Sequence, residues 1–126
     1  MTPFPGRFDR NGVLNGLIDL VFEHGGRYYI VDWKTNWLGE TDADYAPERI
    51  ARAMGDNMYV LQSYLYAAAL LKMFRARGLD YRTHFGGVYY LFLRGLGSGA
   101  NGIWHDVPPE ACLNALLGLF EKGGMP

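Results

Sequence analysis

The chain has 126 residues, a formal net charge of −1, 49% apolar residues and 15% aromatic residues. This length and composition predict one folded domain with a hydrophobic core and exclude a disordered chain. The low charge argues against tight nucleic-acid binding by the domain alone, because such binding depends on many Lys and Arg contacts to phosphate. We therefore expect a partner to deliver any nucleic-acid substrate.

The cysteine content and the length of the apolar runs limit the kinds of metal site and the cellular location that we expect. Cys112 is the single cysteine, which excludes an internal disulfide, a cysteine-rich zinc site and a four-cysteine iron–sulfur cluster. A bound metal is therefore expected to be a hard ion with oxygen ligands. The sequence has neither an apolar run that spans a bilayer nor the pattern of a signal peptide, so we expect a cytoplasmic protein without membrane contact.

The first elements in chain order are an irregular segment and a β-hairpin. Residues 1–12 are rich in Pro and Gly and are expected to be a lead-in or linker to a domain over 13–126. The segments 16–22 and 27–34 are rich in β-branched, aromatic and aliphatic residues, and residues 24–26 (His-Gly-Gly) are a turn signal. This pattern predicts two antiparallel strands.

Two aspartates and a lysine lie on this predicted hairpin. Because strand side chains alternate, Asp32 and Lys34 must share one face and Trp33 must point to the other. Asp19 can be aligned across the hairpin from that pair. An Asp in an apolar strand is costly to bury unless it is hydrogen-bonded, paired or bound to a metal. The trio is therefore a candidate site for a divalent metal and an attacking water beside a phosphodiester.

A structural interpretation of the same residues stays open at this point. Asp32 and Lys34 also fit a same-face ion pair at a sheet edge, with Asp19 satisfied by backbone amides. The D-x-K spacing is short and does not choose between the two interpretations.

The later elements alternate helices with apolar strands. They are a loop over 36–44, a short helix from about 46 that Gly55 ends or interrupts, a long helix from an Asn57 cap to about Arg77 stopped by Gly78, a strand over 81–94, a turn over 95–102, a short strand over 103–105 and a last helix over 108–123. In the long helix, Leu61, Leu65, Ala68 and the stem of Lys72 follow helical spacing. The strand over 81–94 is expected to be central and covered on both faces.

Gln62 and Tyr66 form a second candidate constellation, because their spacing of four places them on one helix face. Tyr offers a ring for stacking and a hydroxyl for a phosphate or a carboxylate. Taken alone, the pair reads as an exposed Gln and a Tyr at the edge of the core. Combined with the carboxylates of the hairpin, it indicates a site.

Other polar residues are expected to be structural. His24, His84 and His105 read as turn, strand-end or surface histidines. Cys112 lies beside Leu113 on the last helix and is expected to be a buried structural thiol, so no covalent nucleophile is predicted.

Four motifs together resemble the C-terminal nuclease domain of RecB, the β subunit of the RecBCD helicase-nuclease (exodeoxyribonuclease V). The resemblance covers roughly residues 12–122, in the order of that family. The motifs are GLIDLVF over 16–22, VDWKTNWLG over 31–39, LQ-xx-LY over 61–66 and HFGGVYYLFLRG over 84–95. Their conjunction is far more specific than D-x-K alone.

The resemblance implies an α/β PD-(D/E)xK nuclease core, which is a restriction-endonuclease-like fold with a mixed central sheet flanked by helices. It implies that Asp19, Asp32 and the main-chain carbonyl of Trp33 are metal ligands and that Lys34 is the catalytic lysine. Gln62 and Tyr66 match the QxxxY motif associated with substrate binding and catalysis. Mg²⁺ is the expected ion, and Mn²⁺ or Ca²⁺ are expected to fit the same site.

The resemblance also carries expectations about biology. It implies hydrolysis of single-stranded DNA from unwound duplex ends during recombinational repair, in a bacterial cytoplasmic complex with the rest of RecB and with RecC and RecD-type subunits. The alternative is a docking module, for the recombinase RecA or for other subunits of the complex, that does not cut. The family adds a histidine ligand from a helix upstream of the first strand, and we expect this chain to be a C-terminal fragment that lacks it.

Overall fold

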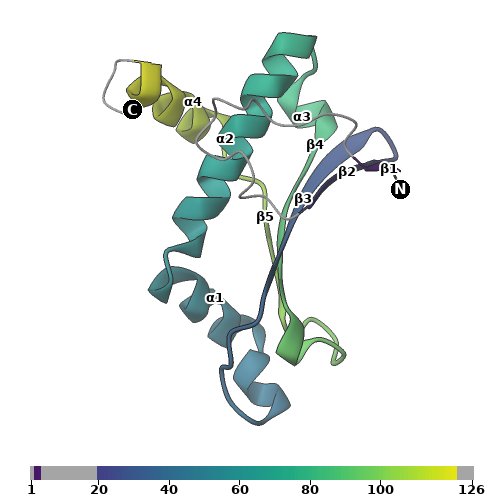
Figure 1. Cartoon of the computed structure of the whole chain (residues 1–126), viewed down its shortest axis with the longest axis vertical. Helices are drawn as coiled ribbons and strands as arrows, with labels where there is room; N and C mark the ends of the chain where they lie inside the picture. Colours follow the sequence, from purple (N-terminus) through teal and green to yellow (C-terminus); the bar gives the residue numbers. More distant parts are fainter. Residues whose placement is uncertain (1, 4–19, 122–126) are drawn as a thin grey trace.

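The computed structural model describes residues 2–3 and 20–121, so Asp19 lies outside the described residues. Figure 1 shows a twisted sheet with helices along one side. The elements are β1 (Thr2–Pro3), β2 (Leu20–His24), β3 (Arg27–Lys34), η1 (Asp42–Tyr45), α1 (Pro47–Asp56), α2 (Tyr59–Arg77), α3 (Tyr81–His84), β4 (Phe85–Phe92), η2 (Leu93–Gly95), β5 (Ile103–Asp106) and α4 (Glu110–Leu119). The expected α/β class is confirmed. Thr2–Pro3, which was expected to be irregular, forms a short strand.

The strands form one mixed sheet in the order β1-β2-β3-β4-β5. β3 and β4 are parallel, and all other neighbouring strands of this sheet are antiparallel. A parallel pair needs a crossover connection, which here contains α1 and α2. β3 is therefore the middle strand, and its carboxyl end lies beside the carboxyl end of β4.

The predicted hairpin is confirmed over its described part. β2 pairs with β3 from His24↔Arg27 to Leu20↔Val31. Gly25 and Gly26 form the turn with φ values of 60° and 82°. A two-residue turn with two positive φ angles matches the right-handed twist of the strands, and glycine adopts it without steric cost. The turn thus fixes the register that sets which face Asp32 occupies.

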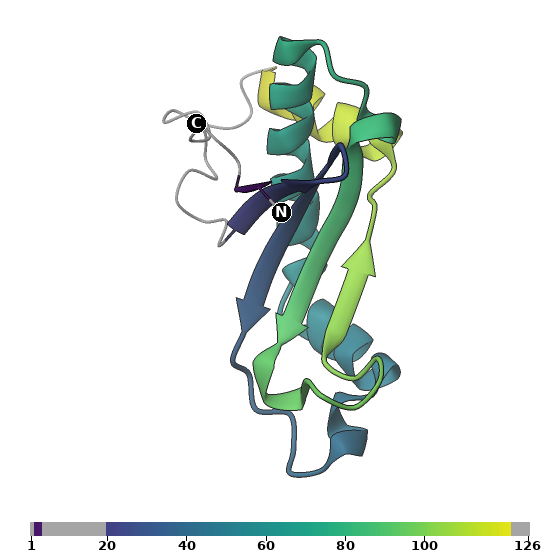
Figure 2. The ribbon, with the colours of Figure 1, turned by 90° about the vertical axis from the view of Figure 1, so that its right-hand side faces the viewer.

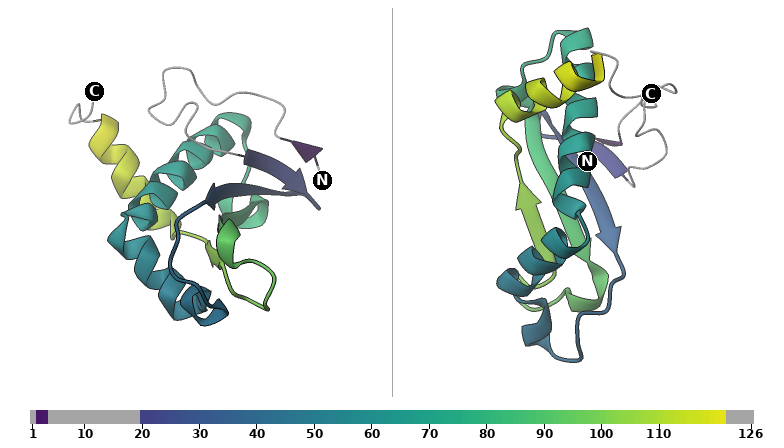
Figure 3. Two further views of the ribbon diagram at one scale, coloured as in Figure 1. Left: turned by 60° about the horizontal axis from the view of Figure 1, so that its bottom comes forward. Right: turned by 90° about the vertical axis from the view of Figure 1, so that its left-hand side faces the viewer.

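The described helices α1, α2 and α4 cover one face of the sheet, as the right panel of Figure 3 shows. The core between these layers is apolar, and several side chains in it are completely buried, namely Ile30, Ile50, Met54, Leu70, Phe74, Val88, Tyr90, Phe92 and Leu113. None of the helices in the described ranges is long and apolar enough to cross a membrane.

The opposite face of the sheet carries a row of rings across four strands. Phe22 and Tyr29 stack at 5.2 Å between ring centroids, Tyr29 and Tyr89 lie at 6.3 Å, and Tyr89 and His105 at 4.3 Å. Figure 2 looks onto this face, and none of the described helices crosses it. The sheet therefore has one face packed by helices and one aromatic face.

The start of α2 differs from the prediction. Asn57 ends α1, where its Nδ2 donates to the Ala53 carbonyl at 2.8 Å. Met58 precedes α2 with a φ of 59°, in the left-handed region. Asn57 is therefore not the cap of the long helix, because its amide completes the preceding one. Gly78 ends α2 in the left-handed conformation, as predicted.

The buried side of α2 also differs from the predicted stripe. Leu61 is 47% exposed and Lys72 is exposed, whereas Ala68 is buried as expected. The buried positions are Ser63, Tyr66, Ala67, Ala68, Leu70, Leu71 and Phe74. α2 contacts the sheet, α1 and α4, so its buried residues form a broad surface rather than one stripe.

β4 begins at Phe85, later than predicted, because residues 81–84 form α3. Asp80 caps this short helix, and its Oδ2 accepts from the Thr83 amide at 2.9 Å and from the Thr83 hydroxyl at 2.8 Å. These hydrogen bonds hold the pKa of Asp80 below its ordinary value. β4 itself pairs on both sides, as a central strand must.

Candidate active site

The alternation of β3 brings Asp32 and Lys34 together on the face that packs against α2. The Lys34 Nζ lies 3.0 Å from Asp32 Oδ1. Asp32 is only 2% exposed, and Trp33 between them is 44% exposed, which agrees with the predicted faces. β3 is the middle strand of the sheet. The pair is therefore not on an edge strand, as the structural interpretation supposed, and it joins a buried Asp32 to a partly exposed Lys34.

The long helix adds Gln62 and Tyr66 to this pair. The Tyr66 hydroxyl donates to Asp32 Oδ2 at 3.0 Å, and the Lys34 ammonium donates to Gln62 Oε1 at 3.2 Å. Tyr66 is 1% exposed and Gln62 is partly buried. The interpretation of Gln62 as an exposed polar residue is thus wrong, since one helical turn of α2 supplies a partner to each charge of the ion pair.

Two tyrosines that the sequence reasoning missed complete the surroundings of Lys34. The Lys34 Nζ lies 4.2 Å from the Tyr59 ring centroid and 5.4 Å from that of Tyr90. The Tyr90 hydroxyl donates to Gln62 Oε1 at 2.5 Å. A helical signal existed for Tyr59, which shares a face with Gln62 and Tyr66 at the spacing i, i+3, i+7. Tyr90 lay in an apolar run and carried no such signal.

The contacts also fix the orientation of the Gln62 amide. A lysine ammonium has donors but no acceptor, so the Gln62 atom that faces Lys34 must be the oxygen. The same oxygen accepts from Tyr90. Gln62 therefore acts as the acceptor that joins the ammonium of β3 to the phenol of β4.

The geometry has a clear electrostatic consequence. The side chain of Lys34 is 16% exposed, and a carboxylate, an amide oxygen and two aromatic faces surround its ammonium. Cation–π and charge-assisted contacts are strongest where water is excluded. Lys34 is therefore held in one position while part of its side chain still meets solvent.

The donor chemistry of Asp32 fits a hard divalent cation. Its carboxylate oxygens are the ligand type that such ions prefer, and a carboxylate can accept from several partners at once. Over residues 2–3 and 20–121, no three His, Cys, Asp or Glu side chains gather to hold a metal ion. Asp19, the second expected carboxylate ligand, lies outside the described residues.

The remaining polar residues lie apart from this cluster. His24 ends β2 at the turn, His84 ends α3 and His105 lies on β5, in agreement with structural positions. Cys112 is exposed, so its prediction as a buried thiol is wrong. Leu113 next to it is completely buried, and a rotation of about 100° per residue turns Cys112 toward solvent.

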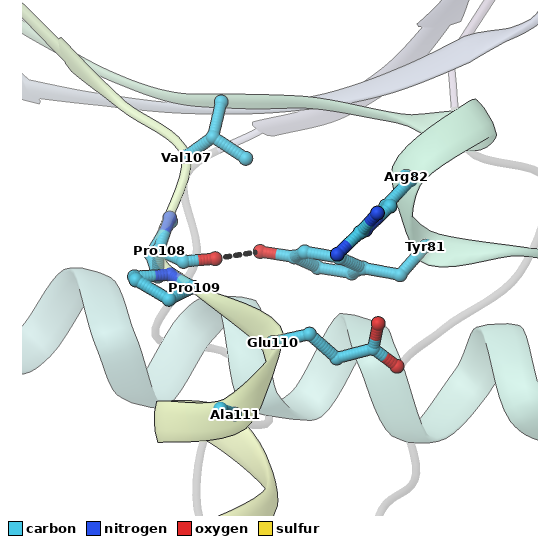
Figure 4. A pocket seen from close by; sticks show the side chains of 7 residues that line it. All are labelled: Tyr81, Arg82, Val107, Pro108, Pro109, Glu110 and Ala111. Atoms are coloured by element: carbon cyan, nitrogen blue, oxygen red, sulfur yellow. Dashed lines mark hydrogen bonds between the residues drawn. The ribbon is translucent and has the colours of Figure 1, made fainter.

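A separate hollow of about 320 Å³ lies between α3 and the start of α4, and Figure 4 shows the side chains that line it. The Tyr81 hydroxyl crosses it and donates to the Pro108 carbonyl at 2.6 Å. Burial, with the nearby Glu110 and Asp106 carboxylates, raises the pKa of Tyr81. The phenol therefore stays protonated and serves as a structural donor. None of the predicted site residues lines this hollow.

The mixed sheet carries an Asp-x-Lys pair on its middle strand, and a comparison with protein families gives the class of protein. The family model of the PD-(D/E)XK nuclease superfamily matches residues 3–116, and the chain belongs to this superfamily. Such nucleases generally use divalent metal ions.

Curated relatives make the resemblance more specific. The chain is 53% identical over 110 residues to the RecBCD enzyme subunit RecB of Escherichia coli strain K12, which covers 84% of the chain and 9% of that protein. It is 42% identical to the same subunit of Haemophilus influenzae, over 86% of the chain and 9% of the relative. It is also 42% identical to that of Mycobacterium tuberculosis, over 89% and 11%. The resemblance to RecB is thus confirmed, and the chain spans about a tenth of the length of these relatives.

Proposed function

We propose that this chain is a Mg²⁺-dependent nuclease domain that hydrolyses phosphodiesters in single-stranded DNA. The observation that carries the proposal is the buried cluster of Asp32 and Lys34 with Gln62 and Tyr66 from α2. A buried ion pair contributes little to stability, and an apolar group of the same volume often serves a fold better. A buried charged cluster at the carboxyl end of the middle strand is better explained by chemistry.

The ligands proposed for Mg²⁺ are the carboxylates of Asp19 and Asp32 and the main-chain carbonyl of Trp33. The last described ladder pair is Leu20↔Val31, and in the sequence Asp19 immediately precedes Leu20 and Asp32 immediately follows Val31. When bound, the ion lowers the pKa of a coordinated water and neutralises charge on the phosphate. Mn²⁺ and Ca²⁺ prefer oxygen ligands as well and are expected to occupy the same site.

The roles of the side chains follow from their contacts. Lys34, held by Asp32 and Gln62, places a positive charge where negative charge grows on the phosphate and orients the attacking water. Tyr66 keeps the Asp32 carboxylate in one rotamer. Gln62 and Tyr59 hold the ammonium, so it needs no reorganisation during the reaction. We infer direct hydrolysis by water, without a covalent intermediate on the protein.

The wider role proposed is that of the nuclease domain in an exodeoxyribonuclease V-type helicase-nuclease of the bacterial cytoplasm. In this role the single strand comes from unwound duplex ends during recombinational repair. The partners are the rest of a RecB-type polypeptide and RecC- and RecD-type subunits. The similarity over most of this chain supports this role. Delivery by these partners also suits a domain with a net charge of −1.

The test compares cleavage of single-stranded DNA in Mg²⁺ by the wild type, Lys34→Ala and Lys72→Ala. Lys72 is a matched control because it is an exposed lysine on α2. We expect cleavage by the wild type and by Lys72→Ala, no cleavage in EDTA, and a loss of at least about 100-fold in Lys34→Ala. Electron paramagnetic resonance of bound Mn²⁺ adds a readout that does not depend on activity, and Asp32→Asn should weaken this binding.

A second candidate function is docking of the recombinase RecA without DNA cleavage, and the row of aromatic rings on the helix-free sheet face favours it. Docking by this face should be insensitive to Lys34→Ala, because Lys34 points to the opposite face. If neither this chain nor a longer polypeptide containing it cuts DNA, while RecA binding survives Lys34→Ala, docking replaces hydrolysis as the proposed function.

A further inference from the structure

Trp37 is a large apolar side chain that the fold leaves 63% exposed. It lies three residues after Lys34, in the connection between β3 and η1 at the lower end of the molecule in Figure 1. Single exposed apolar residues are common on protein surfaces. The surroundings of Trp37 are less common, because hydrogen bonds hold the backbone around it.

Hydrogen bonds hold both residues that precede Trp37. The Thr35 carbonyl accepts from Arg94 Nε at 2.7 Å, which ties the segment to η2. The Asn36 Oδ1 accepts from the Tyr59 hydroxyl at 3.3 Å, which ties it to α2. The chain therefore approaches Trp37 along a fixed path.

Hydrogen bonds also hold the residue that follows Trp37. The Leu38 amide donates to the Tyr45 hydroxyl at 2.9 Å, and the Leu38 carbonyl accepts from Arg49 at 3.4 Å. Tyr45 is 3% exposed, so this anchor belongs to the core. Trp37 thus presents its ring from a preorganised backbone, so stacking of a partner on the ring requires little loss of conformational entropy in this segment.

Trp37 also lies beside the candidate active site. The Tyr59 ring contacts the Lys34 ammonium, and its hydroxyl contacts Asn36. One side chain therefore connects the lysine to the neighbour of Trp37. Three residues of chain span at most about 11 Å between the Cα atoms of Lys34 and Trp37. A nucleic-acid strand with a phosphate at Lys34 has its adjacent bases within reach of the indole.

We propose that Trp37 is a stacking platform for a base of single-stranded DNA next to the phosphate held at Lys34. This proposal rests on the proposed nuclease function and names a base subsite for it. An indole face stacks on any base, which suits a nuclease without sequence preference. The exposed guanidinium of Arg94, bound to the same segment, adds positive charge that attracts the strand. This charge favours a nucleotide over an apolar protein partner.

The test measures binding in EDTA at low salt, so that metal-dependent cleavage does not interfere. The probes are fluorescein-labelled oligothymidylate and an abasic oligomer of the same length, which keeps the phosphates and lacks the bases. The proteins are the full chain and its Trp37→Leu, Trp37→Phe and Leu119→Ala variants. Leu119 is the matched control, because it is 61% exposed at the end of α4.

We expect the wild type to prefer oligothymidylate over the abasic oligomer. Trp37→Leu should bind oligothymidylate about 5- to 150-fold more weakly and bind the abasic oligomer unchanged. Trp37→Phe should keep most of the preference, because it retains an aromatic face, and Leu119→Ala should match the wild type. Equal affinity of Trp37→Leu and wild type for oligothymidylate would overturn the proposal.

Failure of the stacking proposal can be distinguished from failure of the proposed nuclease function. If the wild type shows the base preference and loses it in Trp37→Leu but never cleaves DNA in Mg²⁺, the stacking site stands and hydrolysis falls. If the wild type cleaves DNA and Trp37→Leu cleaves it with an unchanged KM, hydrolysis stands and the stacking site is wrong.

Discussion

The hydrogen bond between Tyr66 and Asp32 provides a test that links the stability of the fold to the site. Tyr66→Phe removes only the hydroxyl, which donates to Asp32 Oδ2 at 3.0 Å. Both residues are at most 2% exposed, so water cannot replace the lost donor. A hydrogen bond to a charged group contributes about 1.5–3 kcal/mol, and a buried carboxylate that loses a donor keeps its desolvation cost.

We therefore expect Tyr66→Phe to lower the free energy of unfolding by about 2 kcal/mol, or the Tm by roughly 6 °C for a chain of this size. Urea denaturation followed by circular dichroism measures this directly. Tyr64→Phe is the control, because Tyr64 lies on the same helix and no hydrogen bond of its hydroxyl is found within the described structure. It should unfold within about 0.5 kcal/mol of the wild type.

A double-mutant cycle then isolates the charge. In the Asp32→Asn background the acceptor is neutral, so Tyr66→Phe should cost only about 1 kcal/mol. The same cost in both backgrounds, or no cost in the wild type, would show that the phenol does not support a buried charge. Tyr66 would then be a packing residue of the core rather than a support for the Asp32 carboxylate.

Three further outcomes are expected. Gln62→Met removes the acceptor that the Lys34 ammonium and the Tyr90 hydroxyl share. We expect it to lower the free energy of unfolding in urea by about 2 kcal/mol and the rate of DNA cleavage about tenfold. Gln62→Glu should keep more of both, and a Met variant as stable as the wild type would contradict this. Hydrogen bonds from Thr83 lower the pKa of Asp80. The ionised cap therefore stabilises the fold above a pH of about 4, and this stabilisation is lost as the pH falls through the native pKa. The Tm should fall less in acid for Asp80→Asn than for the wild type, and parallel pH profiles of the two proteins would count against the cap. Gly87 has a φ of 114°, and a Cβ added there would clash with His105 and lie 2.9 Å from the Asp106 carbonyl oxygen. Gly87→Ala should therefore lower the free energy of unfolding by at least about 2 kcal/mol in thermal melting. Gly118→Ala is the control, because a Cβ at that position has no atom within 4 Å.

Much of the fold could be predicted because its signals are local. Alternation in residues 27–34 fixes the faces of Asp32 and Lys34, and the glycines at 25 and 26 give the turn. The misplaced boundaries arise where two local signals compete. Asn57 is a good capping residue for the helix that follows it, yet its side chain bonds back to α1, and only the three-dimensional angle between the helices decides this.

Asp32, Lys34, Gln62 and Tyr66 were predicted as candidates and lie together, but their meeting could not be predicted from the sequence. Gln62 and Tyr66 follow from helical spacing, but their contact with β3 depends on how α2 lies across the sheet, which no short window of sequence encodes. Tyr90 illustrates the limit, because the parallel pairing Asp32↔Tyr90 places it beside Gln62. That pairing joins residues 58 positions apart, so no local pattern could reveal it.

The burial of Asp32 beside a partly exposed Lys34 favours the chemical interpretation of the D-x-K spacing. An ion pair at a sheet edge would be solvated and would contribute less than about 1 kcal/mol. The observed pair lies on the middle strand, where removal of the Asp32 carboxylate from water costs several kcal/mol before its attraction to the partly exposed Lys34 is counted. The fold offsets this cost with Tyr66, Gln62, Tyr59 and Tyr90, although an apolar pair in the same place would need no such partners. A domain that keeps this expensive arrangement at the carboxyl end of its middle strand is expected to use it, which is why variants of the supporting residues should change catalysis as well as stability.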